Sequence, residues 1–205
     1  NELFFEIIIA PEYETEAFKI LKTKKNRIIL KLNDINNISK LTFRSILNGL
    51  LSQERDVIID SKKNLDKITN IKPTKKQESD LLFANTICKH TKSNAIVLVK
   101  DKQLIGIGCG QTSRIDALKQ AINKAKSFGF NLDGAVMASD AFFPFPDCLE
   151  IAFKEGINAV IQPGGSIKDQ EVIDEADVEL LSKINTGFKR NGKKISSVNI
   201  IDNKS

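Results

Sequence analysis

Two loops of this sequence carry side chains that could bind a flat, polar molecule. The first loop, Asp140–Asp147, reads DAFFPFPD and combines three phenylalanines with two prolines. Proline disfavours the helical conformation of the residue before it, so Phe143 and Phe145 are expected to be extended. With Phe142, they either form a stacking wall for an aromatic ligand or belong to the hydrophobic core.

The second loop, Pro163–Ser166, reads PGGS and lies between a predicted strand and a predicted helix. Backbone N–H groups at a helix N-terminus attract anions, so Gly164, Gly165 and Ser166 could hold a carboxylate or a phosphate. A plain turn from strand to helix with a serine cap would have the same sequence. Ligands of open α/β sheets usually bind on loops of this kind, outside the carboxyl ends of the strands.

Three further polar residues could do chemistry. Asn94 offers donors and an acceptor that suit a carboxamide or a base edge, or it is a turn residue at a strand entry. Arg114, in the first turn of a predicted helix, either binds an anion or pairs with Asp116 or another acid. His90, the single histidine, is either a general base or a residue that caps a helix end.

The glycines of GIGCGQ, at positions 106, 108 and 110, resemble a dinucleotide-binding fingerprint only superficially. They do not fit the spacing G-x-G-x-x-G, and the strand before them belongs to a predicted hairpin. We therefore expect no dinucleotide site. The glycines are expected to let the backbone approach a ligand or another strand closely.

Strands and helices must alternate to position these residues. Apolar runs predict strands at 3–10, 27–32, 94–100, 103–108, 134–139 and 158–162, and a further strand that ends at 53–56. Periodic patterns predict helices at 12–22, 74–90 and 113–128, with two more that begin at 147 and 166. The first strand is expected to be buried on both faces, and Asp101-Lys102 to form a tight hairpin turn.

Helix caps and domain boundaries follow from local composition. Asp147 with Glu150, and Ser166 with Asp169, are predicted capping boxes. We predict the end of an upstream α/β lobe at 1–60, a surface connector at 61–76 and a C-terminal lobe at 77–182. A basic tail that could be disordered is predicted at 183–205, and the polar segment ELLSKIN at 179–185 fits a frayed helix or disorder better than a strand.

Composition narrows the class of protein. The 205 residues carry a net charge of +5, and no apolar run is long enough to span a membrane. Scattered lysines and a single tyrosine leave no stacking platform for nucleic acid, so we expect no nucleic-acid partner. The three widely spaced cysteines predict reduced thiols in the cytoplasm and no metal site.

Long motifs of this sequence resemble one family. KSNAIVLVKDKQLIGIGCGQTSRIDA, ASDAFFPFPD and IQPGGSIKDQEVI are similar to the formyltransferase portion of the bifunctional purine biosynthesis proteins called PurH. The resemblance extends from about Phe4 to Ile173, with the motifs in the family's order.

The resemblance implies transfer of a formyl group from 10-formyltetrahydrofolate to the amine of aminoimidazole carboxamide ribonucleotide (AICAR). It implies a layered, cytidine deaminase-like α/β fold with a mixed sheet flanked by helices and no zinc. It also implies a homodimer with shared active sites, or association with an upstream half. Asn94 and Arg114 resemble residues that contact the nucleotide. The positions that resemble the lining of the folate pocket are Ile115, Phe142, Asp147, Ser166 and Ile167.

The sequence also departs from the family. The cyclohydrolase domain and the K-H-x-N-P-x-G motif, with its catalytic lysine and histidine, have no counterpart here, and Lys89-His90 belongs to another family segment. Lys189 replaces an arginine near the end, which loses bidentate phosphate binding. We therefore assign no catalytic residue within this chain. The alternative to part of a formyltransferase is a non-catalytic or degraded α/β fragment that binds folate or nucleotide, or docks with its other half.

Overall fold

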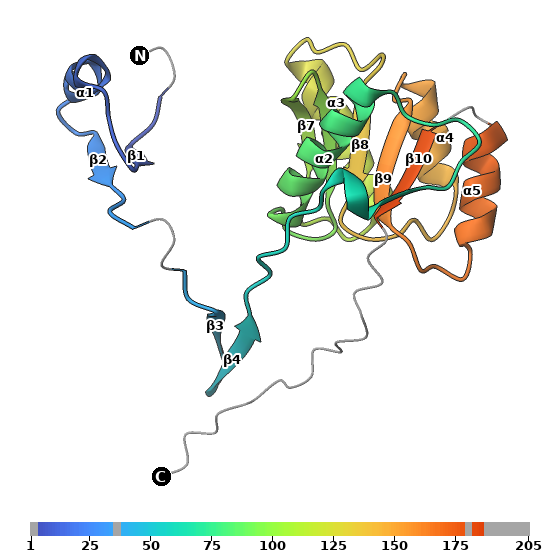
Figure 1. Cartoon of the computed structure of the whole chain (residues 1–205), viewed down its shortest axis with the longest axis horizontal. Coiled ribbons are helices and arrows are strands. Elements are labelled where there is room, and N and C mark those ends of the chain that lie inside the picture. The colour runs from blue at the N-terminus through green and yellow to red at the C-terminus, as the bar shows by residue number, and fades with distance from the viewer. Residues whose placement is uncertain (1–3, 35–37, 179–181, 187–205) are drawn as a thin grey trace. The chain divides into compact units, whose positions relative to one another are not determined.

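The computed structural model describes residues 4–34, 38–178 and 182–186. The described residues form two compact units, one up to Asp56 and one from Val57 onward. Each unit has its own sheet or sheets, coloured blue to teal and teal to red in Figure 1. No helix of the described residues combines the length and apolar character that crossing a membrane requires.

The first unit begins with the predicted β–α–β arrangement. Strand β1 (Ile7–Ala10), helix α1 (Thr15–Lys22) and strand β2 (Ile28–Lys31) follow one another, and β1 pairs with β2 in parallel. Strands β3 (Leu41–Ile46) and β4 (Gly49–Glu54) form a separate antiparallel hairpin.

The prediction that the first strand is buried on both faces is wrong. Ile7 and Ile9 are 53% and 59% exposed, because no layer of described residues covers the face of the two-stranded sheet that carries them. Ile20 of α1 is likewise 52% exposed. Phe18 instead lies beside Tyr13, with ring centroids 6.1 Å apart.

The second unit has a six-stranded mixed sheet in the order β5-β10-β9-β8-β6-β7. The strands are β5 (Leu65–Lys67), β6 (Ile96–Lys100), β7 (Gln103–Gly108), β8 (Val136–Ser139), β9 (Ala159–Pro163) and β10 (Ser182–Thr186). The helices are α2 (Lys75–Lys89), α3 (Arg114–Ser127), α4 (Asp147–Lys154) and α5 (Asp169–Val178), with a short 3-10 helix at Lys62–Asn64. This is the predicted mixed α/β architecture.

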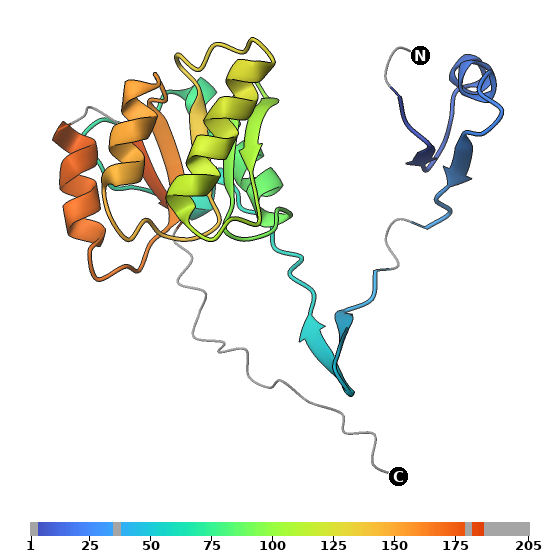
Figure 2. The same cartoon turned by 180° about the vertical axis from the view of Figure 1, so that it is seen from behind.

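Helices cover both faces of this sheet. In Figure 2, α3, α4 and α5 lie in front of the sheet, and α2 packs on the opposite face. Side chains alternate between the two faces, as the pleat of a strand requires. On β6, Ile96 and Leu98 join the core beneath α3 and α4, whereas Val97 and Val99 join the core beneath α2.

Several local predictions are confirmed. Asp101 and Lys102 both have positive φ, 53° and 56°, which is the two-residue hairpin turn expected between β6 and β7. Asp80 of α2 accepts hydrogen bonds from both turn N–H groups, at 3.1 and 2.9 Å. The helix predicted at 74–90 is α2, and it begins with a complete capping box between Thr74 and Gln77.

Two segments differ from the predicted connector and tail. Part of the segment 61–76 belongs to the sheet, because β5 pairs antiparallel with β10. Residues 182–186 form strand β10 rather than a frayed helix or a disordered segment, and this strand lies between β5 and β9. Its backbone pairing on both sides outweighs the polar sequence. Residues 187–205, which include Lys189, lie outside the described residues.

The glycines of β7 serve a different purpose from the predicted one. A Cβ atom on Gly106 would lie 2.3 Å from the carbonyl oxygen of Ala121, and one on Gly108 would lie 1.9 Å from that of Ala117. Both alanines belong to α3. The glycines therefore let a helix, and not a ligand or a strand, approach β7.

A buried carboxylate ties α2 to the edge of the sheet and makes stability depend on pH. Glu78 bonds to Lys67 of β5 and lies 3.8 Å from Lys62, and its side chain is 11% exposed. The hydrogen bond from Lys67 and the two positive charges hold the Glu78 pKa below its usual value of 4.5, although burial acts in the opposite direction.

A carboxylate with a lowered pKa stabilises the fold above its unfolded pKa and loses that contribution as pH falls through the folded value. The melting temperature should therefore fall between about pH 5 and pH 2, and Glu78→Gln should flatten that part of the curve. Thermal unfolding of both chains across this range measures the difference. Parallel curves would contradict the prediction.

Candidate active site

The segments that carry the predicted site residues meet at one edge of the large sheet. This edge is the one formed by the carboxyl ends of the parallel strands, and not an outermost strand. Strands β8 and β9 run parallel and end at this edge, whereas β6 runs antiparallel to β8 and begins there. In register, Ile96 at the start of β6 lies opposite both Ser139 at the end of β8 and Gly108 at the end of β7. The topology thus brings Asn94, Arg114 and the aromatic loop to the same edge.

Asp140 connects three of these segments. Its Oδ1 accepts a hydrogen bond from the Ala95 N–H at 2.9 Å, and its Oδ2 accepts one from the Ser93 hydroxyl. The same Oδ1 lies 3.0 Å from Nη2 of Arg114. The Asp140 carboxylate therefore holds the start of β6, the start of α3 and the end of β8 together. Sequence reasoning did not single out this residue, although it directly follows a buried strand.

Arg114 is an enclosed cation and not a surface residue. Its side chain is 12% exposed, and its Nε–H donates to Oγ of Ser139 at 2.9 Å in addition to the pair with Asp140. The Ser139 hydroxyl in turn donates to the carbonyl oxygen of Ala141 at 2.7 Å. Asp116, the alternative partner considered from sequence, pairs instead with Ser113 at the helix cap.

Asn94 is half-buried beside the turn that joins β7 to α3 and contains Cys109, Gly110 and Gln111. Its Nδ2 donates to the carbonyl oxygen of Gln111 at 2.9 Å, and the two residues also exchange long backbone hydrogen bonds at 3.4 Å. The Gln111 side chain reaches back to the Cys109 carbonyl oxygen at 3.1 Å and to Gln120 at 3.2 Å. The Asn94 amide is therefore held in a fixed place at the sheet edge.

The aromatic loop contains both of the environments considered from sequence. Phe143 is fully buried, whereas Phe142 and Phe145 are 40% and 52% exposed. The Phe145 ring lies 4.9 Å from Nζ of Lys168, which directly precedes α5 and follows the second loop by two residues. One phenylalanine thus anchors the loop in the core, and the other two present apolar surface.

The remaining predicted pocket residues lie at the starts of helices on this edge. Ile115 is half-buried against the core, Asp147 and Ile167 are exposed, and Ser166 is half-buried. Asp147 forms no capping box with Glu150, because the helix cap is Pro146, and Asp147 itself accepts the Cys148 N–H at 2.8 Å.

The second predicted capping box is also absent in the expected form. Ser166 accepts the N–H of Lys168 at 3.1 Å, and Asp169 reaches the N–H of Gly165 at 2.6 Å. Gly165 has a φ of +112°, which favours glycine and lets the turn place its N–H toward that carboxylate. The turn is therefore occupied by its own acid side chain and is not an open anion site.

His90 occupies the end of α2, and its backbone N–H donates to the Ile87 carbonyl oxygen at 3.0 Å. The imidazole is exposed. This matches the predicted capping position, and it gives no support to a role as general base. Among the described residues, no three His, Cys, Asp or Glu side chains are grouped so that they could hold a metal ion.

The three cysteines differ in their expected reactivity. Burial raises the pKa of the Cys88 and Cys148 thiols to about 12, and the nearby carboxylates of Asp140 and Asp147 act in the same direction. Cys109 is exposed in the turn between β7 and α3. Since the thiolate is the reactive form, we expect a thiol reagent at about pH 8 to modify Cys109 rapidly and the other two only after unfolding. Rapid reaction of two or more thiols in the folded chain would contradict this.

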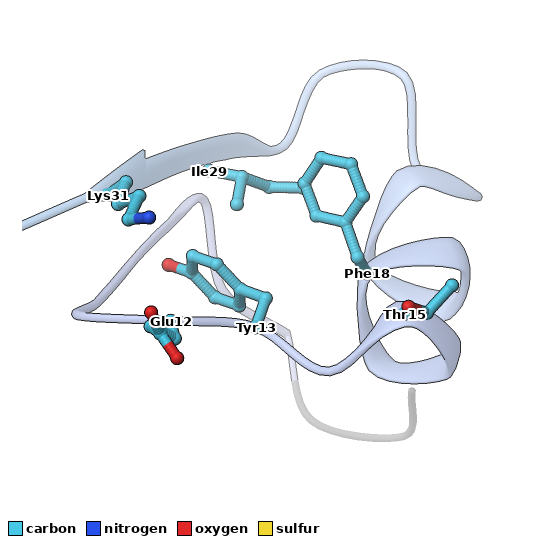
Figure 3. Close-up of a pocket in the computed structure, with 6 residues that line it drawn as sticks. All are labelled: Glu12, Tyr13, Thr15, Phe18, Ile29 and Lys31. Atoms are coloured by element: carbon cyan, nitrogen blue, oxygen red, sulfur yellow. The ribbon is translucent and has the colours of Figure 1, made fainter.

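The first unit contains an open hollow of about 610 Å³, shown in Figure 3. It is lined by Glu12, Tyr13, Thr15, Phe18, Ile29 and Lys31. The Tyr13 hydroxyl donates to the carbonyl oxygens of Leu30 at 2.8 Å and Ile8 at 3.2 Å, so it ties the two strands together. No predicted site residue lines this hollow, and the sheet edge of the second unit remains the candidate site.

Comparison with known proteins points to one family. Residues 1–124 match the model of the family described as AICARFT/IMPCHase bienzyme. The bifunctional purine biosynthesis protein PurH of Bacteroides thetaiotaomicron is 57% identical over 189 residues, which is 92% of this chain and 37% of that protein. The protein of the same name from Aquifex aeolicus is 48% identical over the same shares. This chain therefore spans little more than a third of the length of these curated relatives.

Solved structures give only distant matches. A diaminohydroxyphosphoribosylaminopyrimidine deaminase/5-amino-6-(5-phosphoribosylamino)uracil reductase from Thermotoga maritima is 18% identical with a TM-score of 0.40, and it covers 58% of this chain and 38% of that one. The dCMP deaminase of cyanophage S-TIM5 is 15% identical with a TM-score of 0.38, over 52% of this chain and 94% of its own. Similarity at this level is too low to define the fold more closely than mixed α/β.

Proposed function

Because this chain belongs to the AICARFT/IMPCHase bienzyme family, we propose that it forms part of an AICAR formyltransferase of purine biosynthesis. In this proposal a formyl group passes from 10-formyltetrahydrofolate to the amine of AICAR. The observation that carries the proposal is the convergence of Asn94, Arg114 and the exposed Phe142 on one edge of the sheet. An amide, a cation and an aromatic ring suit a carboxamide nucleotide and a pterin.

We assign the nucleotide to Asn94 and Arg114. The Asn94 amide supplies donors and an acceptor for a carboxamide, and the guanidinium supplies positive charge and a planar array of donors. The folate is assigned to the exposed aromatic loop and the neighbouring helix starts, at Ile115, Phe142, Asp147, Ser166 and Ile167. Phe142 offers a face for stacking, and Asp147 offers a carboxylate to the N–H groups of a pterin.

In the reaction, the AICAR amine attacks the formyl carbon while a base takes one of its protons. The C–N bond to the folate then breaks, and a proton passes to the folate nitrogen. Positive charge near the developing oxyanion lowers the barrier. We assign Arg114 and Asn94 to binding, and we assign no general base to the described residues. The relatives are almost three times as long as this match, so the proposal leaves catalysis to a site completed by other residues.

We further propose that the site is completed by a second copy of the chain or by association with an upstream half. A cytoplasmic location agrees with the free thiols of all three cysteines. The alternative function is a folate- or nucleotide-binding fragment without turnover. The same edge of the sheet would carry the binding in either case.

Formyl transfer from 10-formyltetrahydrofolate to AICAR tests the proposal. We would measure it with the chain alone, and with the remainder of the Bacteroides thetaiotaomicron relative added. Activity on mixing that neither component shows would support part of a formyltransferase. Ligand binding without activity in the mixture would favour the binding fragment, and the absence of both would overturn the proposal.

A further inference from the structure

We infer that Gln162 is a positioning residue that fixes the aromatic loop and thereby presents Phe142 to the folate. This inference rests on the proposed function and extends it to a residue that neither the sequence motifs nor the resemblance assign to a role. Gln162 is the fourth residue of β9, at the carboxyl end of the strand, and it is fully buried.

The contact that carries the inference is one hydrogen bond. Oε1 of Gln162 accepts the backbone N–H of Phe143 at 2.8 Å, and this N–H is itself buried. A buried backbone N–H without a partner is costly, so this bond strongly favours one position of the loop relative to β9. The face of β9 that carries Gln162 also carries Val160, which belongs to the core beneath α3 and α4.

A second anchor lies one residue before Phe142. The Ser139 hydroxyl donates to the carbonyl oxygen of Ala141 at 2.7 Å, and Phe143 fills the core with its fully buried ring. Phe142 is thus held between an anchored carbonyl group and an anchored N–H group. Its own ring remains 40% exposed. A short segment fixed on both sides can present an aromatic ring without the entropy cost of ordering it on binding.

The two anchors of the aromatic loop belong to two different strands, and only one of them contacts a residue assigned to the nucleotide. Ser139 belongs to β8 and contacts Arg114, whereas Gln162 belongs to β9 and contacts the loop. Loss of the Gln162 anchor should therefore affect the folate more than the nucleotide. A purely structural role for Gln162 would instead weaken binding of both ligands equally, so the two affinities distinguish the roles.

The test compares Gln162→Met, which keeps a similar length but removes the acceptor, with Val160→Ala on the same face of β9. We expect Gln162→Met to weaken binding of 10-formyltetrahydrofolate about tenfold, as loss of one buried hydrogen bond would, and to leave AICAR affinity within about twofold. Val160→Ala should lower the melting temperature and leave both affinities nearly unchanged. Titration calorimetry and thermal unfolding supply these values.

A double variant makes the test independent of how well Gln162→Met folds. If Gln162 acts through Phe142, then Phe142→Ala should weaken folate binding, and adding Gln162→Met should weaken it no further. Additive losses, equal losses for both ligands, or an unchanged folate affinity in Gln162→Met would overturn the inference. If the unsubstituted chain, mixed with the remainder of its relative, binds no folate at all, then the proposed function fails and the inference with it.

Discussion

Replacing Arg114 with alanine is expected to lower the free energy of unfolding by about 3 kcal/mol, even without any ligand. The change leaves the Asp140 carboxylate, whose side chain is 14% exposed, without its cation. Breaking an enclosed ion pair by removing one partner is costly because the remaining charge is poorly solvated. The N–H of Ala95 and the hydroxyl of Ser93 still contact Asp140, so we expect the lower end of the usual range.

The same substitution should weaken AICAR binding about a hundredfold under the proposed function, since a charge-assisted contact to an anionic nucleotide is lost. Arg114→Lys is the matched control. It keeps the charge, but a single ammonium cannot donate to Ser139 and Asp140 with the geometry of a guanidinium. We expect it to recover most of the stability and only part of the affinity.

Denaturant unfolding and calorimetric titration with AICAR separate the two effects of Arg114. The double variant Arg114→Met with Asp140→Asn removes both charges, and it should be more stable than Arg114→Ala. If Arg114→Ala retains the original stability, then the pair with Asp140 contributes little. If it loses stability but binds AICAR normally, then Arg114 is a structural residue and its assignment to the nucleotide is wrong.

The second large effect is expected from Gly108→Ala, which should lower the free energy of unfolding by about 3 kcal/mol or more. The added Cβ would lie 1.9 Å from the carbonyl oxygen of Ala117 and 2.6 Å from its carbonyl carbon. Both atoms belong to the backbone of α3, which cannot turn aside as a side chain could. The helix and β7 must therefore separate, and Arg114 at the first position of α3 moves with the helix.

Gly129→Ala is the control for Gly108→Ala. Gly129 has a φ of +75°, and a Cβ atom there would meet nothing within 4 Å. The loss in free energy of unfolding of Gly129→Ala therefore measures the cost of a strained backbone alone, which is about 1 kcal/mol. Denaturant unfolding of both variants gives the comparison. A Gly108→Ala chain as stable as the Gly129→Ala chain would mean that α3 is not packed on β7 as described.

The elements that sequence predicted well are those specified by neighbouring residues. The helix predicted at 74–90 begins where expected because its cap, Thr74 with Gln77, lies within one helical turn, and Asp101-Lys102 turns because two adjacent residues adopt positive φ. The continuous apolar run Ile96–Val99 in β6 likewise encodes burial on both faces within a few positions. The alternation of strands and helices followed from these local signals, whereas the mixed sheet was implied by the family resemblance.

Features that depend on distant residues were not predictable in the same way. The partner of Arg114 is Asp140, which is brought to it by the pairing of β6 with β8. The role of Gly108 depends on the path of α3, and sequence spacing suggested a ligand or a strand instead. The exposure of Ile9 was missed because an apolar run predicts burial, whereas burial needs a covering layer.

The place of β10 in the sheet has a consequence for synthesis of the chain. Strand β5 pairs with β10 alone in the described sheet, and the register joins Lys67 to Ile184. Because a ribosome releases the chain from its N-terminus, β5 emerges long before its partner and waits as an unpaired strand while α2 to α5 are made. Its closure spans more than a hundred residues, and such distant pairing is slow to form. Termination before β10 would leave the exposed edge of β9 free to pair with another chain.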